Sequence, residues 1–282
     1  MITLGLDIGA TKISYAVFDK KRKKLLLSKK LEYRRRTRGE FLKILNEISK
    51  DKELKKLNFM KIGIGIAGVI ESGKLVYSPN FPNLKGINLI KEIKKIWGRP
   101  VVIENDANCF AYAEAILEAG KKYNNIVGLT LGSGLGAGII LNKEIYHGRG
   151  AAGEISHSIT RCQAQGVKCQ EMEDLVSEKF FHKLGIKNPR DLELKARKGD
   201  KKAKKIYKNF GKNLGIVIAN IVDILDPDVV VLGGSLSNAY NLFIQETKKT
   251  AKKFIVSPKS KNIPILKSRL GKPAGAIGAA LL

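Results

Sequence analysis

An internal repeat constrains the fold of this chain more than any other feature of its sequence. Residues 4–11 (LGLDIGAT) and 127–134 (VGLTLGSG) both read as an apolar strand, a polar residue, an apolar residue and a turn of small residues containing glycine. In each copy the chain then re-enters a β-rich run, at 13–19 and at 138–142. Repetition of this kind indicates that one supersecondary unit occurs twice. The sequence therefore predicts two similar halves, each with a glycine hairpin, that can face each other across a cleft.

The rest of the chain alternates β-rich runs with segments of helical periodicity. Besides the repeated runs, strands are expected at 24–33, 60–68, 100–106, 226–235 and 263–267. Helices are expected at 39–57, 86–97, 107–121, 171–185, 189–198, 200–225, 239–254 and 275–282. This order is typical of mixed α/β sheets, and 282 residues are enough for two domains.

Both glycine turns have the composition of an anion-binding loop. A turn of small residues exposes successive backbone N–H groups, and glycine allows phosphate to approach closely. Thr11 and Ser133 can add hydroxyl donors, Lys12 adds a positive charge, and Asp7 can hold Mg²⁺ directly or through water. Hairpins without any ligand produce the same pattern. The argument for phosphate binding therefore rests on the pair of turns in matching positions.

Two other glycine-rich segments resemble nucleotide-binding motifs only superficially. The run 132–138 has the spacing GxGxGxG rather than GxGxxG and leads into a strand. The run 68–74 resembles a Walker A loop, but Leu75 follows its lysine, so no hydroxyl is available for magnesium. Neither segment is interpreted as a nucleotide site.

The segment ENDAN (104–108) lies between a predicted strand and a predicted helix. Ligand-binding groups collect at the carboxyl ends of strands in α/β sheets. Asn105 can both donate and accept hydrogen bonds, as a sugar hydroxyl requires, and Asp106 supplies a carboxylate. A simple helix N-cap would also explain these residues. Taken alone, the segment leaves both interpretations open.

The net charge of +26 is concentrated in basic runs at 20–24, 34–38 and 201–205. Such runs can bind nucleic acid or form a solvated, lysine-rich surface. They lack interleaved aromatic residues, and no zinc finger, helix-turn-helix or RNA-binding signature accompanies them. We therefore expect a solvated surface rather than a nucleic-acid partner, with a positive field that attracts anions such as ATP.

The sequence indicates a cytoplasmic protein without membrane contact. No segment approaches the roughly 18 apolar residues of a membrane span. The first residues reach charge and glycine too early for a signal peptide. The odd number of cysteines, three, argues against a secreted disulfide scaffold.

Seven segments, in this order and spacing, resemble the ROK family of sugar kinases over nearly the whole chain. They are LGLDIGATK (4–12), GIGIAG (63–68), ENDANCFAYAE (104–114), LTLGSGLGAGII (129–140), GRGAAGEISH (148–157), EDLVS (173–177) and DPDVVVLGGS (226–235). The resemblance implies a two-domain actin/hexokinase-like (ribonuclease H-like) α/β fold with mixed sheets and an interdomain cleft. It places 1–107 and about 268–282 in a small domain, and 108–267 in a large domain. A homodimer is expected because dimers are common among such enzymes.

The resemblance also implies an activity: ATP- and Mg²⁺-dependent phosphorylation of a hexose, glucokinase-like and at O6. Asp106 matches the catalytic base, and an aspartate with an ordinary pKa is already ionised at neutral pH. The positions that match ATP contacts are Asp7, Gly9, Thr11, Lys12, Thr130, Gly132, Ser133, Gly134, Gly233 and Gly234, with Asp7 also near magnesium. The positions that match sugar contacts are Gly68, Asn80, Asn105, Asp106, Glu154, His157 and Glu173.

The sequence departs from the family pattern after His157. The family often carries a CxCGxxGCxE cluster that binds structural zinc together with the histidine. Here the corresponding run (162–171) has two cysteines, so His157, Cys162 and Cys169 are too few for a closed tetrahedral site, and zinc is doubtful. The same departure leaves open whether Glu171 or Glu173 meets the sugar. The helix expected after Glu173 favours Glu173.

Several alternatives remain at this point. N-acetylmannosamine, N-acetylglucosamine and fructose are alternatives to glucose as the substrate. Some relatives are sugar-responsive DNA-binding repressors with an added N-terminal winged helix-turn-helix domain, but here the first phosphate loop begins at residue 7. An acetate kinase or a nucleotide-hydrolysing chaperone of the same fold is a third alternative. The ENDAN and GEISH segments favour a sugar pocket.

Overall fold

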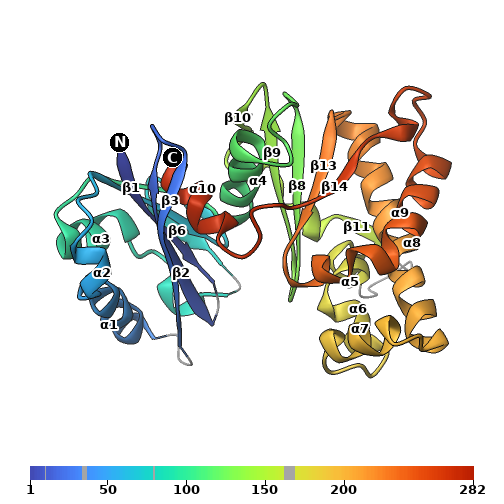
Figure 1. Ribbon diagram of the computed structural model, residues 1–282, viewed down its shortest axis with the longest axis horizontal. Coiled ribbons are helices and arrows are strands. Elements are labelled where there is room, and N and C mark those ends of the chain that lie inside the picture. The colour runs from blue at the N-terminus through green and yellow to red at the C-terminus, as the bar shows by residue number, and fades with distance from the viewer. Residues whose placement is uncertain (10, 34–36, 79, 162–168) are drawn as a thin grey trace.

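The computed structural model describes residues 1–9, 11–33, 37–78, 80–161 and 169–282. It contains two five-stranded mixed sheets, one in each half of the molecule (Figure 1). In spatial order, the first sheet consists of β3 (Lys24–Glu32), β2 (Lys12–Asp19), β1 (Ile2–Ile8), β4 (Lys61–Ile66) and β7 (Val101–Asn105). The second consists of β10 (Glu144–Ile145), β9 (Leu135–Leu141), β8 (Ile126–Leu131), β13 (Val229–Gly233) and β14 (Ile265–Lys267).

The two sheets have the same pairing pattern, which confirms the internal repeat. In the first, β1 pairs antiparallel with β2 and parallel with β4, β2 pairs antiparallel with β3, and β4 pairs parallel with β7. In the second, β8 takes the place of β1, with antiparallel β9 on one side and parallel β13 on the other, and β10 and β14 complete the order. The two glycine turns therefore occupy equivalent places, each between the central strand and its antiparallel neighbour.

Helices α4 (Asp106–Leu117) and α10 (Ala274–Leu281) lie between the two sheets (Figure 1). Helix α10 packs so closely on β4 that a Cβ atom at Gly63 would collide with the carbonyl oxygen of Ala279. Helix α4 packs equally closely on β9, because a Cβ atom at Gly138 would collide with the carbonyl oxygen of Ala107. The glycines on the facing strands thus allow two helices to fit between two sheets.

The outer faces of the sheets are covered by the remaining helices. On the first sheet these are α1 (Arg38–Ser49), α2 (Lys52–Lys55) and α3 (Leu89–Trp97), with the hairpin β5 (Val69–Glu71)–β6 (Lys74–Tyr77) and the short η1 (Pro82–Leu84) nearby. The second half contains α5 (Glu173–Val176), α6 (Glu178–Lys183), α7 (Pro189–Arg197), α8 (Lys201–Leu225), α9 (Tyr240–Phe254), the hairpin β11 (Ile159–Arg161)–β12 (Gln170–Glu171), and the short η2 (Ile155–His157), η3 (Ser235–Ala239) and η4 (Ser260–Asn262).

Two helices expected from the sequence are broken in the structure: 171–185 begins in β12 and continues as α5 and α6, and 39–57 is α1 and α2. Helix α1 ends at Ser49, and α2 begins after Asp51. The Asp51 carboxylate accepts hydrogen bonds from the backbone N–H groups of Glu53 and Leu54, which is the geometry of an N-cap. A helical period across 39–57 does not reveal this break, because the cap depends on one side chain rather than on the apolar pattern.

Each half has its own apolar core. The core of the second half includes a group of aromatic rings from α6, α8 and α9, in which Phe210 stacks on Phe181 and meets Phe243 edge-on.

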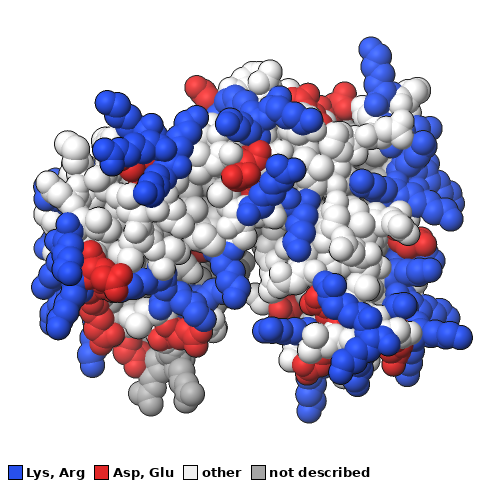
Figure 2. Space-filling view, in the orientation of Figure 1, with Lys and Arg blue, Asp and Glu red and all other residues white. Residues whose placement is uncertain are grey.

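Within the described ranges, the structure contains no helix long and apolar enough to cross a membrane. Figure 2 shows a notch between the two halves, and it shows Lys and Arg spread over both halves among Asp and Glu. This distribution supports a solvated basic surface on the face shown.

Candidate active site

The register of the first sheet brings the first glycine turn and the ENDAN segment together. In the parallel pairs, Ile8 at the end of β1 lies opposite Ile66 of β4, and Ile66 lies opposite Asn105 of β7. The carboxyl ends of parallel strands meet at one edge of a sheet. The chain leaves this edge after Ile8 and after Asn105, so residues far apart in sequence share one end of the sheet.

The second sheet brings its glycine turn next to the GGS turn in the same way. Thr130 near the end of β8 lies opposite Gly233 at the end of β13. Gly234 has a φ of 81°, and a Cβ atom there would collide with the backbone of Leu131. The predicted second phosphate loop and the predicted adenosine turn are therefore adjacent, and Gly234 is needed both for its backbone angle and for the close approach.

The two glycine turns are closed by their own backbone. Gly9 donates its N–H to the carbonyl of Lys12 at 2.9 Å, and Gly132 donates to the carbonyl of Gly134 at 3.0 Å. The carbonyl of Gly9 also accepts a 2.5 Å hydrogen bond from the Tyr33 hydroxyl. The N–H groups of Gly9 and Gly132 are therefore occupied in holding the turns in shape. A bound phosphate would have to accept hydrogen bonds from other N–H or O–H groups of the turns. Thr11, at the start of the strand that follows, is exposed, as is Lys12.

Asn105 is the N-cap of α4, and Asp106 is the first residue of the helix. The Asn105 Oδ1 atom accepts from the N–H of Ala107 at 2.8 Å and of Asn108 at 3.2 Å. Its Nδ2 atom donates to the carbonyl of Gly68 at 3.4 Å, which brings two predicted sugar-contacting positions together. The capping role thus falls to Asn105. The Asp106 carboxylate accepts from backbone N–H donors as well, among them that of Ala107 at 2.9 Å.

Asp106 lies close enough to Asp7 to influence the ionisation of Asp7. Burial and then the negative charge of Asp106 raise the pKa of Asp7 to about 7, against a smaller lowering effect of Lys12. Burial also raises the pKa of Asp106 to about 6; backbone N–H donors oppose this rise, and the charge of Glu154 adds to it. The sequence analysis required only that Asp106 be ionised at neutral pH, and a pKa of about 6 still allows this. Its carboxylate is ionised at neutral pH but is a stronger base than an exposed aspartate.

Glu154 lies on the loop between β10 and η2, on the other side of the site from the first sheet. Its effect on the pKa of Asp106 shows that the two carboxylates are near each other. The preceding Gly153 has a φ of 93° and packs against the carbonyl of Ala137 in β9. The loop therefore follows the second sheet closely and presents Glu154 toward the first.

Of the two glutamates that the sequence left open, Glu171 lies beside His157. Strand β12 pairs with β11, so Glu171 is opposite Ile159, and its Oε2 atom is 3.4 Å from Nδ1 of His157. Both side chains are partly exposed. Glu171 and His157 therefore form one polar group next to the loop that carries Glu154.

Glu173 lies at the second glycine turn instead. Its Oε2 atom accepts a 2.9 Å hydrogen bond from the N–H of Leu135 and lies next to Gly134. Its Oε1 atom is 2.5 Å from the ammonium group of Lys179. The structure thus places Glu173 among the residues that we expect to meet phosphate. Ser133 lies in the same turn, and Asn80 follows β6 in the segment before η1.

Comparison with known proteins agrees with this geometry. Residues 3–282 match the ROK family. The chain belongs to the ROK family. Among curated relatives, the N-acetyl-D-glucosamine kinase of Vibrio cholerae is 30% identical and that of Vibrio atlanticus is 32% identical; in both comparisons the match covers 99% of this chain and 98% of the relative.

Solved structures of the ROK family share the fold. A glucokinase from Streptomyces griseus, in complex with glucose and AMPPNP, superposes with a TM-score of 0.84 at 24% identity, covering 99% of this chain and 98% of that one. A hexokinase from Thermus thermophilus has a TM-score of 0.79 at 27% identity, covering 100% and 97%. A transcriptional regulator homologous to the E. coli Mlc protein has a TM-score of 0.85 at 23% identity, but only 77% of that chain is covered. The actin/hexokinase-like fold is thereby confirmed.

The structure gives this ROK-family protein two site residues that the sequence analysis missed. The Oε2 atom of Glu104, the first residue of ENDAN, is 2.6 Å from Nε2 of His147. Its Oε1 atom accepts from the N–H of Asn105 at 2.7 Å and from the side-chain amide of Asn108 at 3.0 Å. The sequence did offer a signal for Glu104, because it is the first residue of the ENDAN segment. His147 had no signal beyond its place one residue before GRGAAGEISH.

The zinc hypothesis receives no support from this ROK-family structure. Cys169 is disulfide-bonded, and a disulfide sulfur is not the thiolate that zinc binds. Cys162 lies outside the described residues. Elsewhere in the described ranges, no group of three or more His, Cys, Asp or Glu side chains is arranged to hold a metal ion. The remaining cysteine, Cys109, is a buried free thiol on α4.

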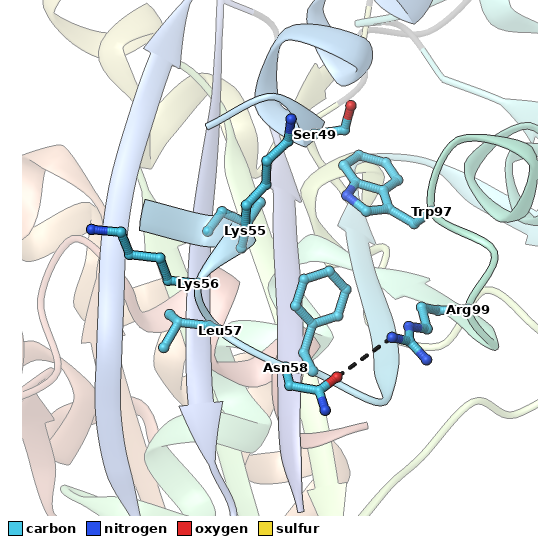
Figure 3. Close-up of a pocket in the computed structure, with 9 residues that line it drawn as sticks. Ser49, Lys55, Lys56, Leu57, Asn58, Trp97 and Arg99 are labelled. Atoms are coloured by element: carbon cyan, nitrogen blue, oxygen red, sulfur yellow. Dashed lines mark hydrogen bonds between the residues drawn. The ribbon is translucent and has the colours of Figure 1, made fainter. Parts of the chain in front are cut away.

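A separate groove lies on the first half, away from the site (Figure 3). It is lined by Ser49, Leu54, Lys55, Lys56, Leu57, Asn58, Phe59, Trp97 and Arg99. The Arg99 guanidinium donates a 3.4 Å hydrogen bond to the side-chain oxygen of Asn58. The lysines and Arg99 are exposed, so the groove has no buried polar group, and we assign it no role.

Proposed function

We propose that this ROK-family protein is an ATP-dependent kinase that phosphorylates a hexose hydroxyl, at O6, with Asp106 as the general base. The observation that carries the proposal is the position of Asp106. It stands at the edge of the first sheet beside the first glycine turn, and its pKa responds to Glu154 on the opposite loop. A carboxylate between a phosphate-binding turn and a polar sugar-binding loop is arranged for phosphoryl transfer to a hydroxyl.

In the proposed reaction, Asp106 accepts the proton of the sugar hydroxyl while that oxygen attacks the γ-phosphorus of ATP. The bond between this phosphorus and the bridging oxygen breaks, and ADP leaves. A base whose pKa lies near the working pH is the most effective, because it is ionised and yet binds a proton well. The raised pKa of Asp106, about 6, meets this condition.

The nucleotide side of the proposal rests on both glycine turns. Lys12 supplies a positive charge at the first turn. The second turn, together with Gly233 and Gly234 beside it, forms the other side of the proposed nucleotide site. Asp7 is suited to be a magnesium ligand. Burial and the neighbouring Asp106 disfavour the ionised form of its carboxylate, and a bound cation would favour that form. Magnesium bound with ATP would neutralise charge on the transferring phosphoryl group.

The sugar itself is proposed from the relatives. The sequence favoured glucose, and that preference stays a prediction. The curated relatives at 30% and 32% identity are N-acetyl-D-glucosamine kinases, so we propose N-acetylglucosamine as the first substrate to test, followed by glucose, with N-acetylmannosamine and fructose after them. A homodimer, a cytoplasmic location and the domain boundaries also stay predictions.

We further propose that Glu171, rather than Glu173, acts with His157 on the sugar, because Glu171 is the glutamate beside that histidine. Paired substitutions separate the two roles. Glu171→Gln should raise the KM for the sugar and leave the KM for ATP unchanged. Glu173→Gln should raise the KM for ATP, because Glu173 holds the second turn. The reverse pattern would restore Glu173 as the sugar contact.

An ADP-release assay over the sugar panel tests the function directly. Asp106→Asn should lower kcat by about 10²–10⁴ and keep sugar binding, while Asp191→Asn, an exposed aspartate on α7, should leave kcat unchanged. Release of ADP with none of the sugars, or a wild-type kcat in Asp106→Asn, would contradict the proposal. Salt-dependent binding of duplex DNA without kinase activity would favour the alternative, a DNA-binding regulator.

A further inference from the structure

A direct side-chain contact joins the two halves beside the site. Glu104 is in β7 of the first sheet, and His147 follows β10 of the second. The 2.6 Å contact between Glu104 Oε2 and His147 Nε2 therefore links the strand that leads to Asp106 with the segment that leads to Glu154. A hydrogen bond to a charged group at this distance is of the stronger kind.

On the first sheet, the Glu104 side chain is fixed. Its Oε1 atom accepts from the N–H of Asn105 and from the side-chain amide of Asn108, and the side chain is only 12% exposed. Asn108 itself is buried in the first turn of α4. These bonds hold one carboxylate oxygen and direct the other toward His147. Glu104 is therefore an anchor for a partner on the opposite half.

On the second half, His147 organises the loop that follows it. Its backbone carbonyl accepts from the N–H of Gly150 at 2.8 Å and of Ala152 at 3.2 Å. Two further short-range hydrogen bonds follow along the loop. The N–H of Glu154 donates to the carbonyl of Ala151, and the N–H of Ile155 donates to the carbonyl of Gly153. The ring of His147 thus contacts the first half while its carbonyl shapes the loop with Glu154.

A tether at this point has a physical reason. The charge of Glu154 raises the pKa of Asp106, which means that the two carboxylates repel each other when both are ionised. That repulsion acts to push the loop away from the first half. The contact between Glu104 and His147 opposes this repulsion. Glu104 immediately precedes Asn105 in β7, and His147 lies seven residues before Glu154.

We propose that His147 is a positioning residue that holds the loop 148–157 against the ENDAN segment through Glu104. The inference rests on the proposed function for its effect on the sugar, since Glu154 and His157 on this loop are the expected sugar contacts. Its structural part, the ordering of the loop, does not depend on the identity of the substrate.

The test compares three variants of the full chain. His147→Phe keeps a ring but cannot bond to Glu104, and His147→Gln keeps a side-chain donor. His182→Phe, an exposed histidine on α6, is the matched control. Hydrogen exchange of the ligand-free proteins reports on loop order, and steady-state kinetics with N-acetylglucosamine and glucose reports on the sugar site.

His147→Phe should speed amide exchange in 148–158 severalfold and raise the KM for the sugar roughly tenfold, the loss expected for one hydrogen bond to a charged group. The KM for ATP should not change, His147→Gln should recover part of the loss, and His182→Phe should match the wild type. Unchanged exchange in 148–158, or a rise in the KM for ATP instead, would overturn the inference. Faster exchange in a protein whose wild type phosphorylates no sugar would uphold the tether and reject the proposed function.

Discussion

The carboxylate of Glu114 accepts a 2.5 Å hydrogen bond from the hydroxyl of Ser268, and these two residues lie on the two segments that connect the halves of the molecule. Glu114 is fully buried on α4, and Ser268 begins the passage from β14 to α10. The same carboxylate accepts from the N–H groups of Arg269 and Leu270, each at 3.1 Å, and of Ala119 at 3.1 Å. One buried side chain therefore ties both connections together.

Replacement of Glu114 should be strongly destabilising. Glu114→Ala leaves the donors of Ser268, Arg269 and Leu270 without an acceptor inside the protein, and it leaves a cavity. Unsatisfied buried donors and a cavity together should lower the free energy of unfolding by about 3 kcal/mol or more. Urea unfolding measures the change. Glu118→Ala, at the exposed end of the same helix, is the control and should stay within about 0.5 kcal/mol. Equal stabilities of the two variants would contradict this role.

The contact between α4 and α10 gives a second prediction. A Cβ atom at Gly278 would collide with the carbonyl oxygen of Cys109, a backbone atom that cannot move alone. Gly278→Ala should therefore lower the melting temperature clearly, despite the higher helix propensity of alanine. Gly39→Ala in α1 meets nothing within 4 Å and should stabilise the protein by roughly 0.5–1 kcal/mol. An unchanged or higher melting temperature of Gly278→Ala would show that the packing between the helices is looser than the structure indicates.

The pH dependence of kcat/KM should report the ionisation of Asp106 in the free enzyme. With a pKa of about 6, Asp106 is protonated in mild acid, so kcat/KM should fall below about pH 6. Glu154→Gln removes a charge that raises this pKa, so the acid limb of the profile should move to lower pH. Glu118→Gln serves as the control. A limb that stays in place, or moves to higher pH, would show that another group controls it.

Asp7 should limit stability at neutral and alkaline pH. Its pKa in the folded protein, about 7, lies above the ordinary value, so the folded state binds a proton more tightly than the unfolded state. Stability from this group is fully present below the ordinary pKa of 3.8 and is lost as pH rises from there through about 7. Asp7→Asn should therefore raise the free energy of unfolding at pH 8, by as much as about 4 kcal/mol, since each pKa unit is worth about 1.4 kcal/mol, and change it little at pH 4. Thermal unfolding without magnesium measures both. Lower stability of the variant at pH 8 would contradict the assignment.

Much of the fold could be predicted from the sequence because its signals are local. The matching runs 4–11 and 127–134 predicted two equivalent hairpins, and the sheets confirm them. The small, apolar tail predicted a closely packed helix, and it forms α10, whose backbone approaches Gly63 of β4 closely. The split of 39–57 into two helices was missed, because the decisive Asp51 cap is a single side-chain interaction.

The sequence by itself determined which chemical groups the site can contain: two turns of small residues, a carboxylate after a strand, and a polar loop near GEISH. The tertiary structure alone decided how these groups affect one another. It placed Glu171 beside His157, Glu173 at the second turn, and His147 on Glu104, and it raised the pKa of Asp106. Burial, charge repulsion and long-range hydrogen bonds depend on residues distant in the chain, and a local pattern carries no record of which distant segments meet.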